Sequence, residues 1–125
     1  MTNFRMERID EINRGPLSQE ILDEGYRYAN ICYWSDVEPA EILSISPSGK
    51  TAKIRKMDAE LVQAPAVVGV GGFVATFENH GQEWKYSSNE DYPIYTIRLT
   101  KKGWSKKGTR ISINNHPVKF HDYNF

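Results

Sequence analysis

The feature that most constrains the fold of this chain is a series of short β-type segments that begins near Tyr33. Turn signals separate these segments at intervals of about eight to twelve residues. The clearest turn is Pro-Ser-Gly-Lys at residues 47–50. No helical pattern separates the segments after residue 50, which argues against a parallel α/β sheet. We therefore predict an α+β, mainly β fold: a small antiparallel barrel or curled sheet with one or two N-terminal helices.

The expected strands share alternating or β-branched apolar residues. Glycines at 69, 71 and 72 indicate a bulge or a close backbone approach within one of them. A turn is expected at 101–103 or at 106–108. The expected strands are 41–46, 51–62, 67–77, 82–86, 94–100, 110–113 and 119–125.

The N-terminal part has a helical pattern instead. Apolar residues recur at spacings near three in residues 2–14, and Gly15-Pro16 follows as a stop signal, which predicts a short helix or an ordered arm. Ser18 is a candidate N-cap for a second helix that ends near Asn30. We expect a single domain over 1–125, with a helical segment at 1–31 and a β-rich core at 32–125.

Cysteine and charge restrict the setting. Cys32 is the only cysteine of the 125 residues, so no internal disulfide can form, and a reducing cytosol is the expected compartment. Residues 1–49 hold four arginines against nine acids, and residues 50–125 hold twelve basic residues against seven acids. Either the two halves attract each other within the fold or an oligomer, or the basic half carries an anion site.

Catalytic motifs are missing from the sequence. A buried structural role fits Cys32 better than a nucleophilic one. A metal site from His116, His121 and Asp122 is a weak alternative, because the three histidines show no metal-ligand spacing. No nucleophile elbow, phosphate loop or paired-carboxylate motif is present. We predict a binding protein with no catalytic residue, no metal and no cofactor.

The expected binding segment is Gly69–Trp84. Its glycines allow close approach, Phe73 offers a flat apolar face, and Asn79 and Gln82 offer amides for a base edge or a ribose. The alternative is a glycine-marked barrel corner with Phe73 in the core. A dinucleotide-binding loop is a poor match, because another strand pattern rather than a helix follows the glycines.

Two arginines within predicted strands, Arg55 and Arg98, either face solvent or act as bidentate phosphate ligands. Four lysines at 101, 102, 106 and 107 surround Trp104 and suit solubility, an exposed hairpin tip or a nucleic-acid contact. Together with the aromatic faces and amides, the arginines favour a nucleotide-like ligand whose base stacks on an aromatic ring.

Short motifs give the chain a resemblance to a family of small phage proteins. They are residues 32–36 (CYWSD), 46–50 (SPSGK), 71–73 (GGF), 82–84 (QEW) and 120–125 (FHDYNF). Within that group the chain resembles the anti-Thoeris sponge proteins, which capture cyclic ADP-ribose isomers. The resemblance implies an anti-defence protein in the cytoplasm of the infected bacterial host. It also implies a homo-oligomer, a hexamer, that binds the signal between subunits without cleaving it.

The resemblance also implies roles for individual residues. Phe73 would be the stacking platform, Asn79 or Gln82 the ribose or base contact, and Arg55 with Arg98 the phosphate ligands. A second site, for cyclic oligonucleotides, would use Glu24, Arg27 and Arg110, with Arg27 on the N-terminal helix.

Two other functions stay open. The lysines around Trp104 would suit a nucleic-acid-binding small barrel, although the neutral net charge weighs against it. Alternatively, exposed aromatic side chains of Tyr33, Trp34 and Trp104 would anchor an inhibitor to a host protein.

Overall fold

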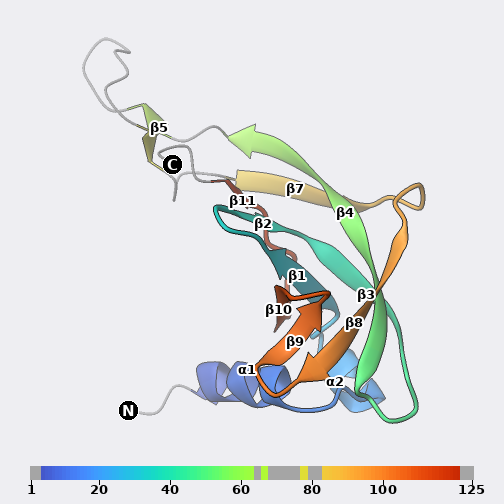
Figure 1. Cartoon of the computed structure of the whole chain (residues 1–125). Coiled ribbons are helices and arrows are strands. Elements are labelled where there is room, and N and C mark those ends of the chain that lie inside the picture. Colours follow the sequence, from blue (N-terminus) through green and yellow to red (C-terminus); the bar gives the residue numbers. More distant parts are fainter. Residues whose placement is uncertain (1–3, 64–65, 68–76, 79–82, 122–125) are drawn as a thin grey trace.

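The computed structural model describes residues 4–63, 66–67, 77–78 and 83–121 of the chain (Figure 1). Its centre is a closed antiparallel barrel of six strands in the order β10-β9-β8-β4-β3-β1, in which β10 pairs with β1 to complete the ring. The predicted α+β, mainly β fold with a small barrel is thus confirmed. The barrel strands are β1 (Tyr28–Cys32), β3 (Ala40–Ile45), β4 (Thr51–Gln63), β8 (Ile94–Thr100), β9 (Gly103–Lys106) and β10 (Thr109–Asn114).

The barrel is filled by side chains at every second position of its strands. In β10, Ile111 and Ile113 are buried, whereas Arg110 is exposed, because successive side chains of a strand point to opposite faces. β8 repeats the pattern, with Ile97 buried and Arg98 exposed. Other buried core residues are Ala29, Ile31, Ala40, Ile42, Ala52, Ile54 and Trp104.

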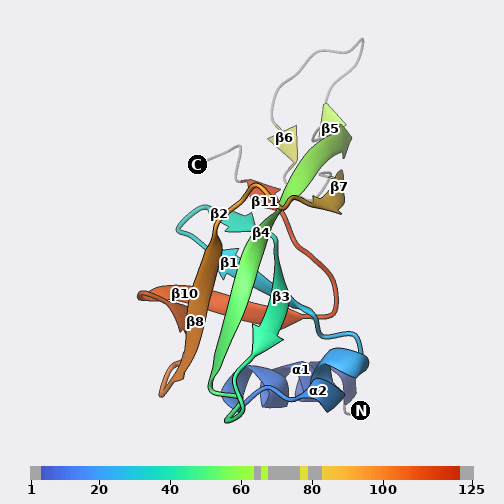
Figure 2. The same ribbon diagram turned by 90° about the vertical axis from the view of Figure 1, so that its right-hand side faces the viewer.

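Two helices, α1 (Phe4–Arg14) and α2 (Gln19–Asp23), cover one end of the barrel (Figures 1 and 2). Ile12 of α1 and Leu22 of α2 are buried in the barrel core. The predicted cap of the second helix is confirmed, because the Ser18 hydroxyl accepts a hydrogen bond from the Ile21 amide at 3.3 Å.

The side chain of Asn13 ties α1 to the barrel. Its Oδ1 accepts from the Ile113 amide at 2.7 Å, and its Nδ2 donates to the Ile113 carbonyl at 2.9 Å. β9 pairs with β10 only at Thr109 and Arg110. The side-chain amide of Asn13 therefore supplies hydrogen-bond partners to the backbone of Ile113, further along β10, where β9 supplies none. The indole Nε1 of Trp104 adds a hydrogen bond to the Gly15 carbonyl at 3.2 Å.

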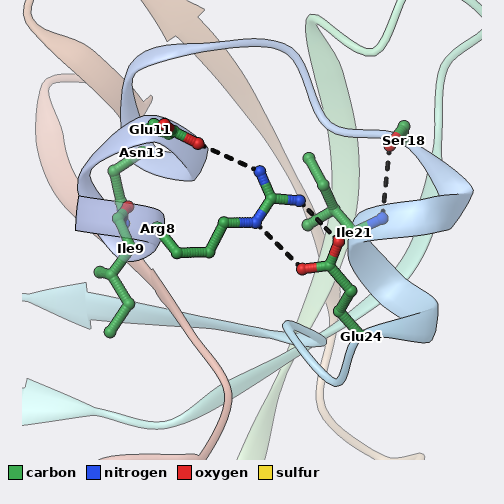
Figure 3. Close-up of polar contacts among 7 residues, drawn as sticks. All are labelled: Arg8, Ile9, Glu11, Asn13, Ser18, Ile21 and Glu24. Carbon is green, nitrogen blue, oxygen red and sulfur yellow. Dashed lines mark hydrogen bonds and ion pairs between the residues drawn. The ribbon is translucent and has the colours of Figure 1, made fainter. Parts of the chain in front are cut away.

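A bidentate ion pair joins the two helices. Arg8 of α1 donates from Nε and Nη2 to the carboxylate of Glu24, at 3.0 and 2.6 Å, and from Nη1 to Glu11 at 3.3 Å (Figure 3). Glu24 is the C-cap residue of α2. The contact holds the helices side by side on the barrel end.

The second half of β4 leaves the barrel and pairs with β7 (Glu83–Ser88) as a two-stranded arm (Figures 1 and 2). Two shorter pairs complete the strands of the described residues. β5 (Ala66–Val67) pairs with β6 (Phe77–Glu78), and β2 (Asp36–Glu38) pairs with β11 (Phe120–His121) and with β1.

Several sequence predictions of individual elements are wrong. The second helix ends at Asp23 rather than near Asn30, and β1 begins at Tyr28, so the β-rich part starts inside the segment predicted to be helical. Of the strand predicted over 67–77, residues 68–76 lie outside the described residues. Its two end residues, Val67 and Phe77, are antiparallel register partners in β5 and β6, so they do not belong to one strand. The predicted strand 94–100 is confirmed as β8, and turns occur at both predicted sites, 101–103 and 106–108.

In the part of the chain that the structure describes, no helix has the length and apolar character needed to span a membrane. The described residues also bring together no group of three or more His, Cys, Asp or Glu side chains suited to a metal ion.

Candidate functional site

Much of the predicted binding segment lies outside the described residues. This applies to Phe73, Asn79 and Gln82, the proposed platform and amide contacts. The metal alternative likewise includes Asp122, which is not described. The site is therefore built here from the charged residues on the barrel strands.

Arg55 lies on the outer face of β4 and already has a carboxylate partner. Its Nη2 is 3.5 Å from Oε1 of Glu41, across the β3–β4 pair, and the Ser88 hydroxyl donates to Oε2 of the same glutamate at 2.9 Å. The Arg55 side chain is only 16% exposed, and its buried Nε has no hydrogen-bond partner among the described residues. Arg55 thus offers little charge to a ligand from outside.

Arg98 is exposed, and it is separated from Arg55. Arg55 pairs with Ile94 on β8, and Arg98 lies four positions further along that strand. At 3.3 Å per residue this separates the two backbone positions by about 13 Å. The structure therefore does not bring Arg55 and Arg98 together as one phosphate clamp.

The three residues predicted for a second site are also divided. Glu24 is held by Arg8, and Arg27 lies 3.6 Å from Asp23 in an exposed ion pair. Arg27 directly precedes β1 instead of belonging to a helix. Arg110 pairs with Cys32 at the other end of β1.

The structure brings Arg98 and Arg110 together instead. Ser105 of β9 is the register partner of Arg98 on one side and of Arg110 on the other. Trp104 points into the barrel, so Ser105 points outward with the two arginines. Neighbouring strands lie about 4.8 Å apart, which places the two arginine backbones roughly 10 Å from each other across the serine. We call this line Arg98–Ser105–Arg110 the arginine row.

Lysines surround the arginine row because both turns of the β8–β9–β10 meander are basic. Lys101 and Lys102 lie in the turn between β8 and β9, and Lys106 and Lys107 lie where β9 turns into β10. Lys107 and Gly108 both have positive φ, at 48° and 91°, as a tight hairpin turn requires. We call the arginine row and these four lysines together the basic face.

Opposing negative charge is scarce on the basic face. The 27 residues from Ile94 to Phe120 contain seven Lys or Arg residues and no Asp or Glu. Within the described residues, none of the six cations of the basic face forms an ion pair with a carboxylate. Their positive charge is therefore available to an external anion.

Two open grooves flank the β8–β9 hairpin. One, of about 510 Å³, is lined by Arg98, Lys106, Lys107 and Tyr95. Nζ of Lys106 lies 4.0 Å from the centre of the Tyr95 ring, a cation–π contact that holds the lysine at the groove. The other groove, of about 470 Å³, is lined among others by Arg14, Asp10, Lys101, Lys102 and Arg110. Both volumes fall in the range of about 300–1,000 Å³ usual for small-molecule sites.

Cys32 lies beside the basic face, as the register partner of Arg110. Burial raises the pKa of its thiol, and the nearby positive charge of Arg110 partly opposes that rise. Cys32 is thus a protonated thiol at neutral pH, in keeping with the structural role that the sequence predicts.

The aromatic residues differ from expectation in one case. Trp104, predicted as an exposed anchor, is buried, with 2% of its surface exposed, whereas Tyr33 and Trp34 are exposed at the turn between β1 and β2. The sequence alone did not predict the arginine row, because it does not show which residues of neighbouring strands are register partners. The acid-free stretch of residues 94–120 is a signal that could have located the basic face.

Comparison of the chain with protein-family models, with curated proteins and with solved structures finds no match.

Proposed function

We propose that this protein binds a phosphate-bearing nucleotide on its basic face and holds it without chemical change. The observation that carries the proposal is the arginine row, two exposed guanidinium groups flanking a serine in an acid-free stretch of chain. Guanidinium groups form paired hydrogen bonds with phosphate oxygens, and they keep their charge at any physiological pH.

The arrangement suits a ligand with more than one phosphate group. Two arginines about 10 Å apart at the backbone can reach neighbouring phosphates with their long side chains. The Ser105 oxygen accepts a hydrogen bond from the Gly108 amide at 3.0 Å, which leaves its hydroxyl hydrogen for a phosphate oxygen. The row crosses the three strands, so the lysines of the two turns lie on either side of it and supply further charge.

The resemblance to anti-Thoeris sponge proteins supports a narrower form of the proposal. In this form, the ligand is a cyclic ADP-ribose isomer, a bacterial immune signal whose two phosphates are linked. Cyclic oligonucleotides form a second ligand class. The protein then acts as a phage anti-defence protein in the cytoplasm of the infected host, as a homo-oligomer such as a hexamer, which provides several sites per particle.

The test is isothermal titration calorimetry of a cyclic ADP-ribose isomer into the native protein and into three single variants. Arg98→Ala and Arg110→Ala should each weaken binding by about 1–3 kcal/mol, which is roughly a 5- to 150-fold rise in Kd. Lys85→Ala is the control, because Lys85 is an exposed cation on β7, in the two-stranded arm outside the barrel. Ligand released by heat should be recovered intact.

Binding that is absent at micromolar protein concentration contradicts the narrow form of the proposal. Equal losses in Lys85→Ala and in the two arginine variants would mean that overall positive charge, rather than the arginine row, accounts for the binding. Recovery of a cleaved nucleotide would contradict sequestration and indicate an enzyme.

Single-stranded nucleic acid is the second candidate ligand, and the acid-free stretch of residues 94–120 is the observation that favours it. Its phosphodiester backbone would follow the arginine row and the lysine turns. In that case log Kd should change with log salt by about 0.7 for each phosphate contact. A gel shift that does not respond between roughly 50 and 200 mM salt would exclude this candidate.

A further inference from the structure

The first half of β8 has a strand on one side only. β9 pairs with β8 at Arg98, Leu99 and Thr100, and it then ends at Lys106 and turns toward β10. Residues 94–97 of β8 therefore have β4 on one side and, among the described residues, no strand on the other. We call this stretch the open edge of β8. An open strand edge offers backbone N–H and C=O groups to another molecule.

The register shows which backbone groups point to the open side. The Leu99 amide donates to the Lys50 carbonyl, just before β4, at 2.9 Å, so the backbone groups of Leu99 point toward β4. In an antiparallel sheet this direction alternates along a strand. The N–H and C=O groups of Ile94 and Thr96 therefore point away from β4, to the open side.

The open side is the groove of about 510 Å³ beside the β8–β9 hairpin. Ile94, Tyr95 and Thr96 line it along β8, and Lys107 of the β9–β10 turn lines it as well. Ile94 adds an apolar surface, because 55% of its side chain is exposed. Arg98 lines the same groove and follows Thr96 by two residues, about 7 Å along the strand. A hydrogen-bond donor, an acceptor, an apolar surface and a phosphate ligand thus meet in one groove.

The charge around the open edge favours a nucleotide over a second copy of the chain. Residues 94–120 contain no Asp or Glu. A second copy paired along the same edge would bring its own Arg98 and Lys107 against those of the first, and like charges repel. A nucleotide brings phosphates to these cations instead.

A nucleobase can replace the strand residue that Thr96 lacks. In an antiparallel sheet such a residue exchanges two hydrogen bonds with its register partner, one as donor and one as acceptor. Adenine has the same pair of groups, an N6 amine donor beside a ring-nitrogen acceptor.

We propose that the backbone N–H and C=O of Thr96 bind the hydrogen-bonding edge of a nucleobase that lies against Ile94, with its phosphates on Arg98 and Lys107. The ligand class is thus a nucleotide with an unpaired base such as adenine. The inference rests on the proposed function, since the basic face supplies the phosphate contacts. It adds the recognition of the base, which the cations cannot provide.

Calorimetry compares ATP, N6,N6-dimethyl-ATP and inorganic tripolyphosphate as ligands of the native protein. The dimethyl compound keeps the ring and the phosphates but has lost both N6 hydrogens. It should bind about tenfold more weakly than ATP, because the Thr96 carbonyl then lacks its donor. Tripolyphosphate should bind through the cations alone.

Amide hydrogen exchange, followed by NMR, measures the contact at the open edge directly. The Thr96 amide should exchange rapidly in the free protein and at least about tenfold more slowly with saturating ATP. Tripolyphosphate should not slow it. The Ile97 amide is the matched control, because it points toward β4 and should be protected in every sample.

Two variants separate the backbone of Thr96 from its side chain. Thr96→Pro removes the N–H on the open side without removing a hydrogen bond to β4, a position where a strand tolerates proline. It should raise the Kd for ATP about tenfold and leave that for tripolyphosphate within about twofold. Thr96→Val keeps the N–H and removes the hydroxyl, so it should bind ATP as the native protein does. If Thr96→Pro does not fold, the exchange of the native Thr96 amide decides.

Each contrary outcome overturns the inference in a recognisable way. Equal affinities for ATP and the dimethyl compound, with no protection of Thr96, would remove the base contact and leave phosphate binding intact. Slow exchange of Thr96 in the free protein would mean that the edge is closed. An equal loss of ATP affinity in Thr96→Val and Thr96→Pro would assign the contact to the hydroxyl. Absence of binding by both ATP and tripolyphosphate would contradict the proposed function itself.

Discussion

The two ends of the barrel differ in how their polar groups are used. At the end covered by the helices, polar groups pair with one another: Asn13 with the backbone of Ile113, Trp104 with Gly15, and Arg8 with Glu24. At the end formed by the β1–β2 and β9–β10 turns, Lys106, Lys107 and Arg110 have no carboxylate partner within the described residues, and Trp34 is exposed.

The difference separates stability from binding. Paired groups and buried side chains hold the fold together, and a group already paired has little left for a ligand. Cations without a carboxylate partner cost the fold little, and their charge remains available to a ligand. Substitutions of the paired groups at the helix-covered end should therefore lower stability and spare ligand affinity, and substitutions of the cations without a carboxylate partner should do the reverse.

The largest effect is expected at Gly49, in the turn against the helices. Its φ is +74°, and a Cβ there would lie 2.2 Å from the Leu17 carbonyl oxygen. The Gly49 carbonyl also accepts the Leu17 amide at 2.8 Å, so the two segments cannot move apart without losing that bond. Gly49→Ala should lower the free energy of unfolding by about 3 kcal/mol or more, measured by urea denaturation.

Gly108, in the turn between β9 and β10, is the matched control. Its φ is +91°, and a Cβ there would meet no atom within 4 Å. Gly108→Ala should thus cost only the backbone strain, about 1–2 kcal/mol. Equal losses in the two variants would mean that the turn end is packed as tightly as the helix-covered end, and the comparison would fail.

A smaller effect is expected at Asn13. Asn13→Ala leaves the Ile113 amide and carbonyl without their partners at a partly buried position. The expected loss is about 1–3 kcal/mol by urea denaturation, even though alanine is the better helix former. The control is Asn115→Ala, at an exposed position, which should change stability by less than about 0.5 kcal/mol. A neutral Asn13→Ala would show that the docking of α1 depends on its apolar contacts alone.

Local patterns in the sequence predict much of this fold. The stop signal Gly15-Pro16 and the Ser18 cap place the helix boundaries nearby, and the alternation of residues 94–100 gives β8 its observed bounds. These features depend on neighbours in the chain, so they can be read without a structure. The predicted end of the second helix near Asn30 is wrong because the apolar residues of this stretch serve a short helix first and then β1, where tertiary pairing with β10 decides the structure.

The site was only partly predictable. The sequence marks Arg98 as a candidate phosphate ligand, and the resemblance assigns Arg110 to a different site. Only strand register shows that Ser105 lies between them. It also pairs Arg55 with Arg98, although Glu41, fourteen residues before Arg55, neutralises Arg55 across a hairpin. Trp104 is buried in the barrel core even though four lysines stand within three residues of it in the sequence.

The smallest effect is expected from pH, at the exposed ion pair between the helices. Hydrogen bonds from Arg8 lower the pKa of the Glu24 carboxyl below its ordinary value of 4.5, although partial desolvation opposes this. A lowered pKa in the folded state means that the contribution to stability is fully present above the ordinary value and is lost as pH falls through the lowered one. Glu24→Gln removes this contribution, so the gap in melting temperature between native protein and variant should be present at pH 6 and should shrink below about pH 4.5. Ligand affinity at pH 7 should be the same in both proteins, because Glu24 lies at the end of β1 opposite Arg110. A weaker affinity in Glu24→Gln would mean that the helix-covered end takes part in binding, and it would restore Glu24 to the second site predicted from the sequence.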